Sequence, residues 1–160
     1  MENTLIRLSI KNHFGTARLP SDADLISPEC GFSDGAAQAA NLFQGKTWNN
    51  IDLMSLFHTE DALRSLSDVA FGYYIPAYLD LIVAHYCEAD ALVDTVINTL
   101  TPPVSNGEPR ASWIEKKLKF LNKQQRQVIA TVLQHLKIQH GDFGAKHALE
   151  IYWHRYLEKR

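Results

Sequence analysis

The chain has 160 residues, so we expect one domain, residues 1–160, that buries its own core without disulfides or metals. Hydrophobic residues make up 46% of it and charged residues 21%, which is typical of a globular protein and excludes a largely disordered chain. No stretch approaches the ~20 apolar residues that span a bilayer, and the first residues lack the pattern of a signal peptide. We therefore expect no membrane contact. Since Cys30 and Cys87 form no motif, we expect free thiols in a reducing cytoplasm.

The first half of the chain shows mainly helical periodicity, with apolar residues recurring every three or four positions. Gly15 is a suitable end for the first helix, Ser33 is a suitable N-cap for the second, and Gly45 is a suitable end for that second helix. The pattern predicts helices over 2–14 and 33–44, a proline-containing loop over 16–32, and short helical turns over 48–57 and 60–66.

The apolar centre of the sequence lies around Pro76. Ser67 is a suitable N-cap, and apolar and aromatic residues fill both sides of the proline. Because proline lacks a backbone N–H and clashes with the preceding turn, we expect no continuous helix here. The sequence predicts a short helix that ends before Ile75 and a longer, buried helix that Pro76 opens.

The second half continues the helical pattern. A helix is predicted over 88–100, and a surface loop over 104–110. Asn122 with Gln125 three residues later resembles a capping box at the start of the next helix, and the last helix is predicted over 145–157. No run alternates as a strand would. The predicted fold is all-α, an irregular single-domain bundle of about six to eight helices.

The central block resembles the signature of an uncharacterised bacterial family of small helical proteins. Residues 70–79 contain an aromatic-Tyr-Ile-Pro-Ala-Tyr run, where the family pattern has aromatic-Tyr-Leu-Pro-Ala-Tyr. The loop 19–25 is similar to the family's Pro-Gly-Asp-Asp-type loop, with Ser21 and Ala23 as departures. The segments 120–129 and 148–153 resemble its closing helices. The family has no established activity, so the resemblance implies a helical fold and no chemistry.

Charge is unevenly distributed along the chain. Residues 1–100 hold 13 acidic and 5 basic residues, a net charge of −8, whereas residues 101–160 hold 5 acidic and 11 basic residues, a net charge of +6. Such asymmetry can mark an acidic face and a basic face, or two solvated surfaces without a partner. Folding could also intermix the two halves and remove the asymmetry.

We predict that the acidic half faces a protein partner. Acidic residues in the predicted loops would steer the approach of a basic partner, and aromatic residues would anchor it where they are exposed. The alternative for the loop carboxylates is local hydrogen bonding within the loop. The predicted partner-binding residues are Asp22, Asp24, Trp48, Asp52, Phe57, Glu60, Asp61 and Tyr73.

The basic segment, residues 110–126, is the opposite candidate surface. It carries Arg110, Lys116, Lys117, Lys119, Lys123 and Arg126. Nucleic acid is a candidate partner for such a run because cations pair with phosphates. We expect instead a solvated helix face, since the run lacks an evident interleaved stacking platform.

No catalytic motif is present, so we expect a protein that is not an enzyme. The sequence contains neither the serine-nucleophile motif GxSxG nor a phosphate-binding or dinucleotide-binding loop. His147, Glu150 and His154 would share one face of the last predicted helix. The two histidines would be about 10 Å apart along the helix, too far to hold one ion. We therefore expect no metal and no cofactor.

These observations favour a binding protein. Small stand-alone bacterial proteins of this kind include immunity proteins encoded beside secreted toxins, and by that analogy we predict neutralisation of a cognate toxin. The alternatives are a small enzyme of unknown reaction and a helical adaptor that binds nucleic acid through residues 110–126.

Overall fold

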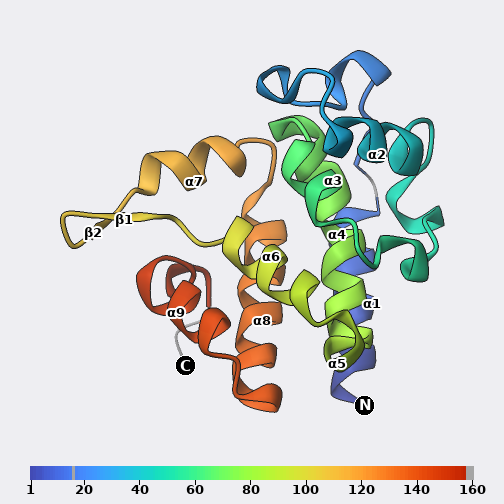
Figure 1. Cartoon of the computed structure of the whole chain (residues 1–160). Helices are drawn as coiled ribbons and strands as arrows, with labels where there is room; N and C mark the ends of the chain where they lie inside the picture. Colours follow the sequence, from blue (N-terminus) through green and yellow to red (C-terminus); the bar gives the residue numbers. More distant parts are fainter. Residues whose placement is uncertain (16, 158–160) are drawn as a thin grey trace.

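The fold is organised around one long buried helix, α4 (Asp68–Ala84), which runs through the middle of the molecule (Figure 1). The computed structural model describes residues 1–15 and 17–157. In α4 every residue from 70 to 83 is buried, so this helix has no solvent-facing stripe. Helix α1 (Glu2–Phe14) packs against both α4 and α8 (Lys123–His140), and these three helices form the frame of the core.

The remaining elements cover this frame. The α-helices are α2 (Asp34–Phe43), α3 (Glu60–Ser65), α5 (Tyr86–Ala89), α6 (Ala91–Thr99), α7 (Ala111–Lys117) and α9 (Phe143–Ile151). The 3₁₀ turns are η1 (Asp22–Asp24), η2 (Pro28–Cys30), η3 (Trp48–Asn50), η4 (Leu53–Leu56) and η5 (Trp153–Tyr156). The predicted all-α class is confirmed, with nine α-helical segments in the part of the chain that the structure describes.

The predicted break at Pro76 is wrong, because α4 continues through the proline. The missing N–H of Pro76 removes the bond that the Gly72 carbonyl would accept, which disfavours a helix in isolation. Here the whole segment is enclosed by neighbouring helices, and tertiary packing outweighs this local cost. The expectation that this stretch lies at the centre of the domain is confirmed, since Ile75 and Leu79 are fully buried.

Helix starts follow the predicted caps. The Ser33 and Ser67 side chains accept hydrogen bonds from backbone N–H groups at the starts of α2 and α4. Asn122 and Gln125 form the predicted capping box, with reciprocal bonds of 2.9 and 3.0 Å. The Gln125 side chain also donates to the His13 carbonyl, which ties the start of α8 to the end of α1.

The predicted helix over 88–100 is instead two helices, α5 and α6. Asp90 separates them with a φ of 40° and a ψ of −115°, a conformation outside the regions that residues other than glycine ordinarily adopt. The predicted loop over 104–110 contains a small antiparallel hairpin of β1 (Val104–Ser105) and β2 (Glu108–Pro109). Asn106 and Gly107 form its turn with positive φ angles, as two-residue hairpins require.

The last predicted helix also ends early. Tyr152 leaves the helical conformation, so that α9 ends at Ile151 and η5 follows. The turn lets Trp153 become fully buried and donate from its indole nitrogen to the Leu100 carbonyl at 2.7 Å. This burial and hydrogen bond favour the bent path over a straight helix. No helix among the described residues is both long and apolar enough to cross a membrane.

Candidate functional site

Six of the eight predicted partner-binding residues are accessible and two are buried. Asp22, Asp24, Asp52 and Asp61 are exposed, and Phe57 and Glu60 are partly buried. Trp48 and Tyr73 belong to the core, with exposed fractions of 4% and 6%. The Trp48 indole donates to the Phe14 carbonyl at 3.1 Å, and the Tyr73 ring packs edge-on against Tyr74. Trp48 and Tyr73 were predicted to anchor a partner only if they were exposed. Because both are buried, they are not available as anchors.

The exposed carboxylates belong to one stretch of chain, residues 17–68, which we call the acidic segment. It holds eight acidic and three basic residues, a net charge of −5. Asp61 pairs with Arg64 at 3.3 Å. The other seven carboxylates have no cationic group within ion-pairing distance among the residues that the structure describes: Asp22, Asp24, Glu29, Asp34, Asp52, Glu60 and Asp68.

Ion pairs formed on folding do not cancel the charge asymmetry. Within residues 1–15 and 17–157, no ion pair between a lysine or arginine and a carboxylate joins the acidic half to the basic half, and the Glu2 carboxylate lies 3.5 Å from the His135 imidazole. The shortest ion pair, Arg7 with Asp80, lies entirely within the acidic half. The negative charge of the acidic segment therefore remains available to solvent and to partners.

Local hydrogen bonds hold several of these carboxylates in place, in agreement with the alternative considered for the loop residues. Asp22 accepts from the Gln44 side chain at 3.1 Å, and Asp24 accepts from the Ser21 hydroxyl at 2.8 Å. Asp52 caps η4, since its carboxylate accepts from the Met54 backbone N–H. The bonds fix the carboxylates without burying them, so a structural and a binding role are compatible.

A hollow of about 630 Å³ opens beside α2. We call it the α2 hollow. Phe57 lines it, and so do Asp34 from the first turn of α2 and His58, whose φ of 62° is unusual for a residue other than glycine. The remaining lining is mixed in character: Ala37, Gln38, Asn41, Leu42, Lys46, Ser55 and Thr59. Of the predicted partner-binding residues, Phe57 lines this hollow. Asp34 also lines it, but the sequence analysis did not include Asp34 among the partner-binding residues.

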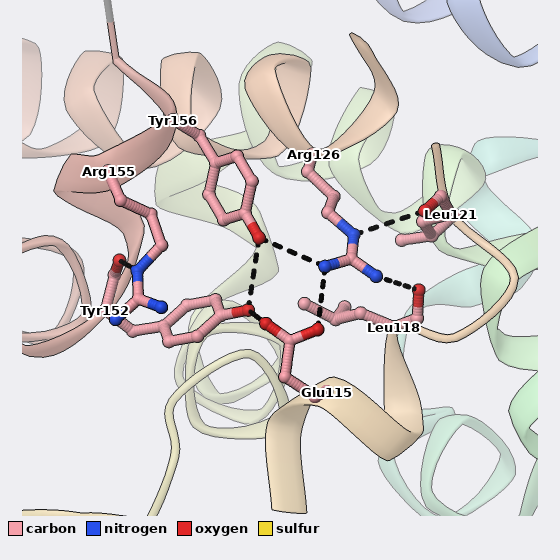
Figure 2. Close-up of polar contacts among 7 residues, drawn as sticks. All are labelled: Glu115, Leu118, Leu121, Arg126, Tyr152, Arg155 and Tyr156. Atoms are coloured by element: carbon pink, nitrogen blue, oxygen red, sulfur yellow. Dashed lines mark hydrogen bonds and ion pairs between the residues drawn. The ribbon is translucent and has the colours of Figure 1, made fainter. Parts of the chain in front are cut away.

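The basic segment is not the simple solvated face that we expected. Arg126 points inward, with only 16% of its side chain exposed. Its guanidinium donates to the Glu115 carboxylate at 2.8 Å and to the Tyr156 hydroxyl at 3.0 Å (Figure 2). It also donates to the backbone carbonyls of Leu118 and Leu121. Arg126 therefore joins α7, the turn after it and the C-terminal residues into one unit.

Glu115 is the centre of this network. It accepts a second bond from the Tyr152 hydroxyl, and the Arg155 guanidinium lies over the Tyr152 ring at 4.3 Å (Figure 2). Burial opposes ionisation of Glu115, but the bonds from Tyr152 and Arg126 and the nearby positive charges outweigh it and lower the pKa of its carboxyl group. The Glu115 carboxylate and the Arg126 guanidinium are both hydrogen-bonded to other groups of the protein. The network therefore holds α7 in place and does not present a reactive group.

We expect Glu115→Gln to lower the free energy of unfolding by about 1 kcal/mol at pH 7, since part of the site is open to water. Because the pKa of Glu115 in the folded protein is lower than its ordinary value near 4.5, the ionised carboxylate stabilises the fold at pH values above 4.5. This contribution is lost as the pH falls through the lower, folded-state pKa. Urea unfolding of both proteins between pH 7 and pH 3 should show the difference shrinking below about pH 4.5. A difference independent of pH would contradict the assignment.

The histidines considered as metal ligands do not come together on one helix. His147 and Glu150 belong to α9, but His154 follows the bend at Tyr152 and lies in η5. Over residues 1–15 and 17–157, the structure holds no group of three or more His, Cys, Asp or Glu side chains that could hold a metal ion. Cys30 and Cys87 are free thiols.

Comparison with known proteins identifies a family but no activity. The model of a family described as a family of unknown function (DUF6714) matches residues 8–157. No curated protein and no solved structure matches the chain.

Proposed function

The chain belongs to this family of unknown function, and we propose that it is a non-enzymatic, cytoplasmic binding protein that neutralises a cognate secreted toxin by direct contact. The observation that carries the proposal is the unpaired negative charge of the acidic segment. Toxins that attack nucleic acids bind their substrates in basic clefts, and an acidic surface can occupy such a cleft by charge complementarity.

The α2 hollow offers a place for an anchor from the partner. Its Phe57 ring supplies apolar contact, and Asp34 supplies a carboxylate without an ion-pair partner among the described residues. A long cationic side chain, arginine above all, presents an apolar stem and a charged head that match these two features. Affinity at interfaces comes from a few such anchors, whereas the surrounding charges set the rate of association.

We expect Asp22→Asn/Asp24→Asn to slow association with the cognate toxin, which under this proposal is encoded by the neighbouring gene, by about three- to tenfold at low salt. The amides keep an acceptor for Gln44 and Ser21, so the loop should stay folded. Stopped-flow measurement of the association rate at 20 mM and 500 mM salt tests this. The difference should largely vanish at high salt, where charges are screened.

A matched control removes two charges from the basic segment, as Lys116→Gln/Lys119→Gln. This control should associate at least as fast as the unchanged protein. The proposed acidic contact surface is wrong if the control is slowed and the aspartate variant is not. The proposed function itself fails if co-expression of the chain does not protect cells from the neighbouring toxin.

A further inference from the structure

A hollow larger than the α2 hollow lies away from it, on the side of α7. This cleft, which we call the α7 cleft, has a volume of about 760 Å³. One wall comes from α7 and the turn after it, and the other from η2 and the start of α4. In Figure 1, α7 stands apart from the body of the molecule, opposite α3 and the N-terminal loops. Residues about 90 positions apart in sequence, such as Cys30 and Phe120, line the same cleft.

The lining of the α7 cleft is cationic. Arg64, Lys116, Lys117 and Lys119 line it, against two carboxylates, Glu29 and Asp68. Among the residues that the structure describes, the three lysines have no carboxylate within ion-pairing distance. The cleft therefore holds uncompensated positive charge in a concave surface, where it attracts anions more strongly than on a flat one.

Aromatic side chains flank these lysines. Trp113 and Phe120 line the cleft with exposed fractions of 39% and 53%. The Lys119 ammonium lies 5.5 Å from the Phe120 ring, and the Lys117 ammonium lies 5.8 Å from the Trp113 ring. The interleaved aromatic platform that we considered missing from the basic segment is therefore present, because Trp113 and Phe120 flank its lysines.

Lys117 forms part of the cleft floor. Its ammonium also sits 4.6 Å from the centre of the buried Phe71 ring. Burial lowers the pKa of this lysine, and the charge of Asp68 opposes the shift. A partly desolvated ammonium that is held over aromatic rings, with no carboxylate within ion-pairing distance, gains a favourable interaction when an anion enters.

A second hollow of about 300 Å³ adjoins the cleft and shares Arg64, Trp113 and Lys117 with it. The second hollow also includes Thr95, Asn98 and Thr99 of α6, which offer neutral hydrogen-bonding groups. Trp113 therefore lines two neighbouring hollows. An extended chain reaches both hollows, whereas a single compact ligand fills one.

We propose that the α7 cleft binds single-stranded nucleic acid, with bases stacked on Trp113 and Phe120 and phosphates held by Lys116, Lys117 and Lys119. Positive charge along a groove together with aromatic platforms is the arrangement that binds single strands without sequence preference. An acidic peptide would satisfy the lysines but would leave two exposed aromatic rings without stacking partners. Glu29 and Asp68 of the acidic segment also line this cleft, whereas Asp22, Asp24 and Asp34, on which the toxin proposal rests, lie outside it.

The test is fluorescence anisotropy with a labelled 15-nucleotide deoxythymidine strand, titrated at several salt concentrations. Trp113→Leu should weaken binding about tenfold or more, because one stacked base is lost. Phe143→Leu is the matched control, since Phe143 is an exposed aromatic outside both hollows, and it should bind as the unchanged protein does. Circular dichroism of each variant shows that its fold is kept.

The proposed contacts of the lysines with phosphates are tested through the salt dependence of strand binding. Lys116→Ala/Lys119→Ala should reduce the slope of log Kd against log salt by about 1.4, for two lost phosphate contacts. Lys123→Ala/Lys137→Ala removes two charges outside the cleft and should leave the slope unchanged. The proposal is overturned if no binding occurs, if poly-glutamate competes as well as unlabelled strand, or if Trp113→Leu binds normally. Asp22→Asn/Asp24→Asn should not weaken strand binding, so this outcome is separate from that of the toxin experiment.

Discussion

We expect Tyr78→Ala to lower the free energy of unfolding by about 3–5 kcal/mol, as large aromatic truncations in packed cores do. Tyr78 lies in the middle of α4 and is fully buried. Its ring contacts Phe43, and its hydroxyl is 3.0 Å from that of Thr59, which links α4 to the start of α3. Burial raises the pKa of the phenol, so Tyr78 is neutral at pH 7. Urea denaturation at pH 7 measures the change.

Tyr78→Phe separates the ring from the hydroxyl. It keeps the packing volume and removes the contacts of the hydroxyl with the Thr59 hydroxyl and carbonyl, and Thr59 still donates to the Leu56 carbonyl. We expect this variant to cost about 1 kcal/mol. If both variants unfold at the same urea concentration as the unchanged protein, α4 is not the centre of the core.

We also expect a large loss of stability when the ion pair between Arg7 of α1 and Asp80 of α4 is broken. The guanidinium makes two bonds to the carboxylate, at 2.6 and 3.1 Å, and Asp80 is only 5% exposed. Arg7→Met should cost about 3 kcal/mol, because it leaves a buried carboxylate without its partner. This value is at the low end for buried pairs, since 37% of the Arg7 side chain is exposed.

Replacing both partners provides the control. In Arg7→Met/Asp80→Leu no charge is left buried, and apolar packing between α1 and α4 replaces the ion pair. We expect the double variant to lie within about 1 kcal/mol of the unchanged protein. A double variant that is less stable than Arg7→Met would show that the cost comes from lost packing rather than from the unpaired carboxylate.

Local signals in the sequence were sufficient to predict the fold class and most helix starts. Caps such as Ser33, Ser67 and Asn122 act through bonds within three residues, so they are visible without knowledge of the fold. Pro76 and the end of α9 could not be predicted in this way. At both places the local preference is outweighed by burial against helices that are distant in sequence, as for Trp153 against Leu100.

The candidate surfaces were only partly predictable. Net charge per segment is a property of the sequence, and the acidic segment was recognised from it. The exposure of a side chain, in contrast, depends on the fold. For this reason Trp48 and Tyr73 were included among the partner-binding residues although both are buried. The α7 cleft needs η2 to lie opposite α7, and no local pattern predicts such a contact. Trp113 and Phe120 flank the lysines in the sequence, but the sequence analysis did not recognise them as a stacking platform.

The separation of charge described above also has a consequence for the protein in bulk solution. A molecule with a net charge of only −2 but with opposite charges on different segments has little overall repulsion between copies. The acidic segment of one copy can attract the basic segment of the next, and such a head-to-tail contact extends into open chains unless its rotation closes a ring. Solubility should therefore be lowest in very dilute buffer and should rise with added salt, as the Debye length falls to about 10 Å near 0.1 M.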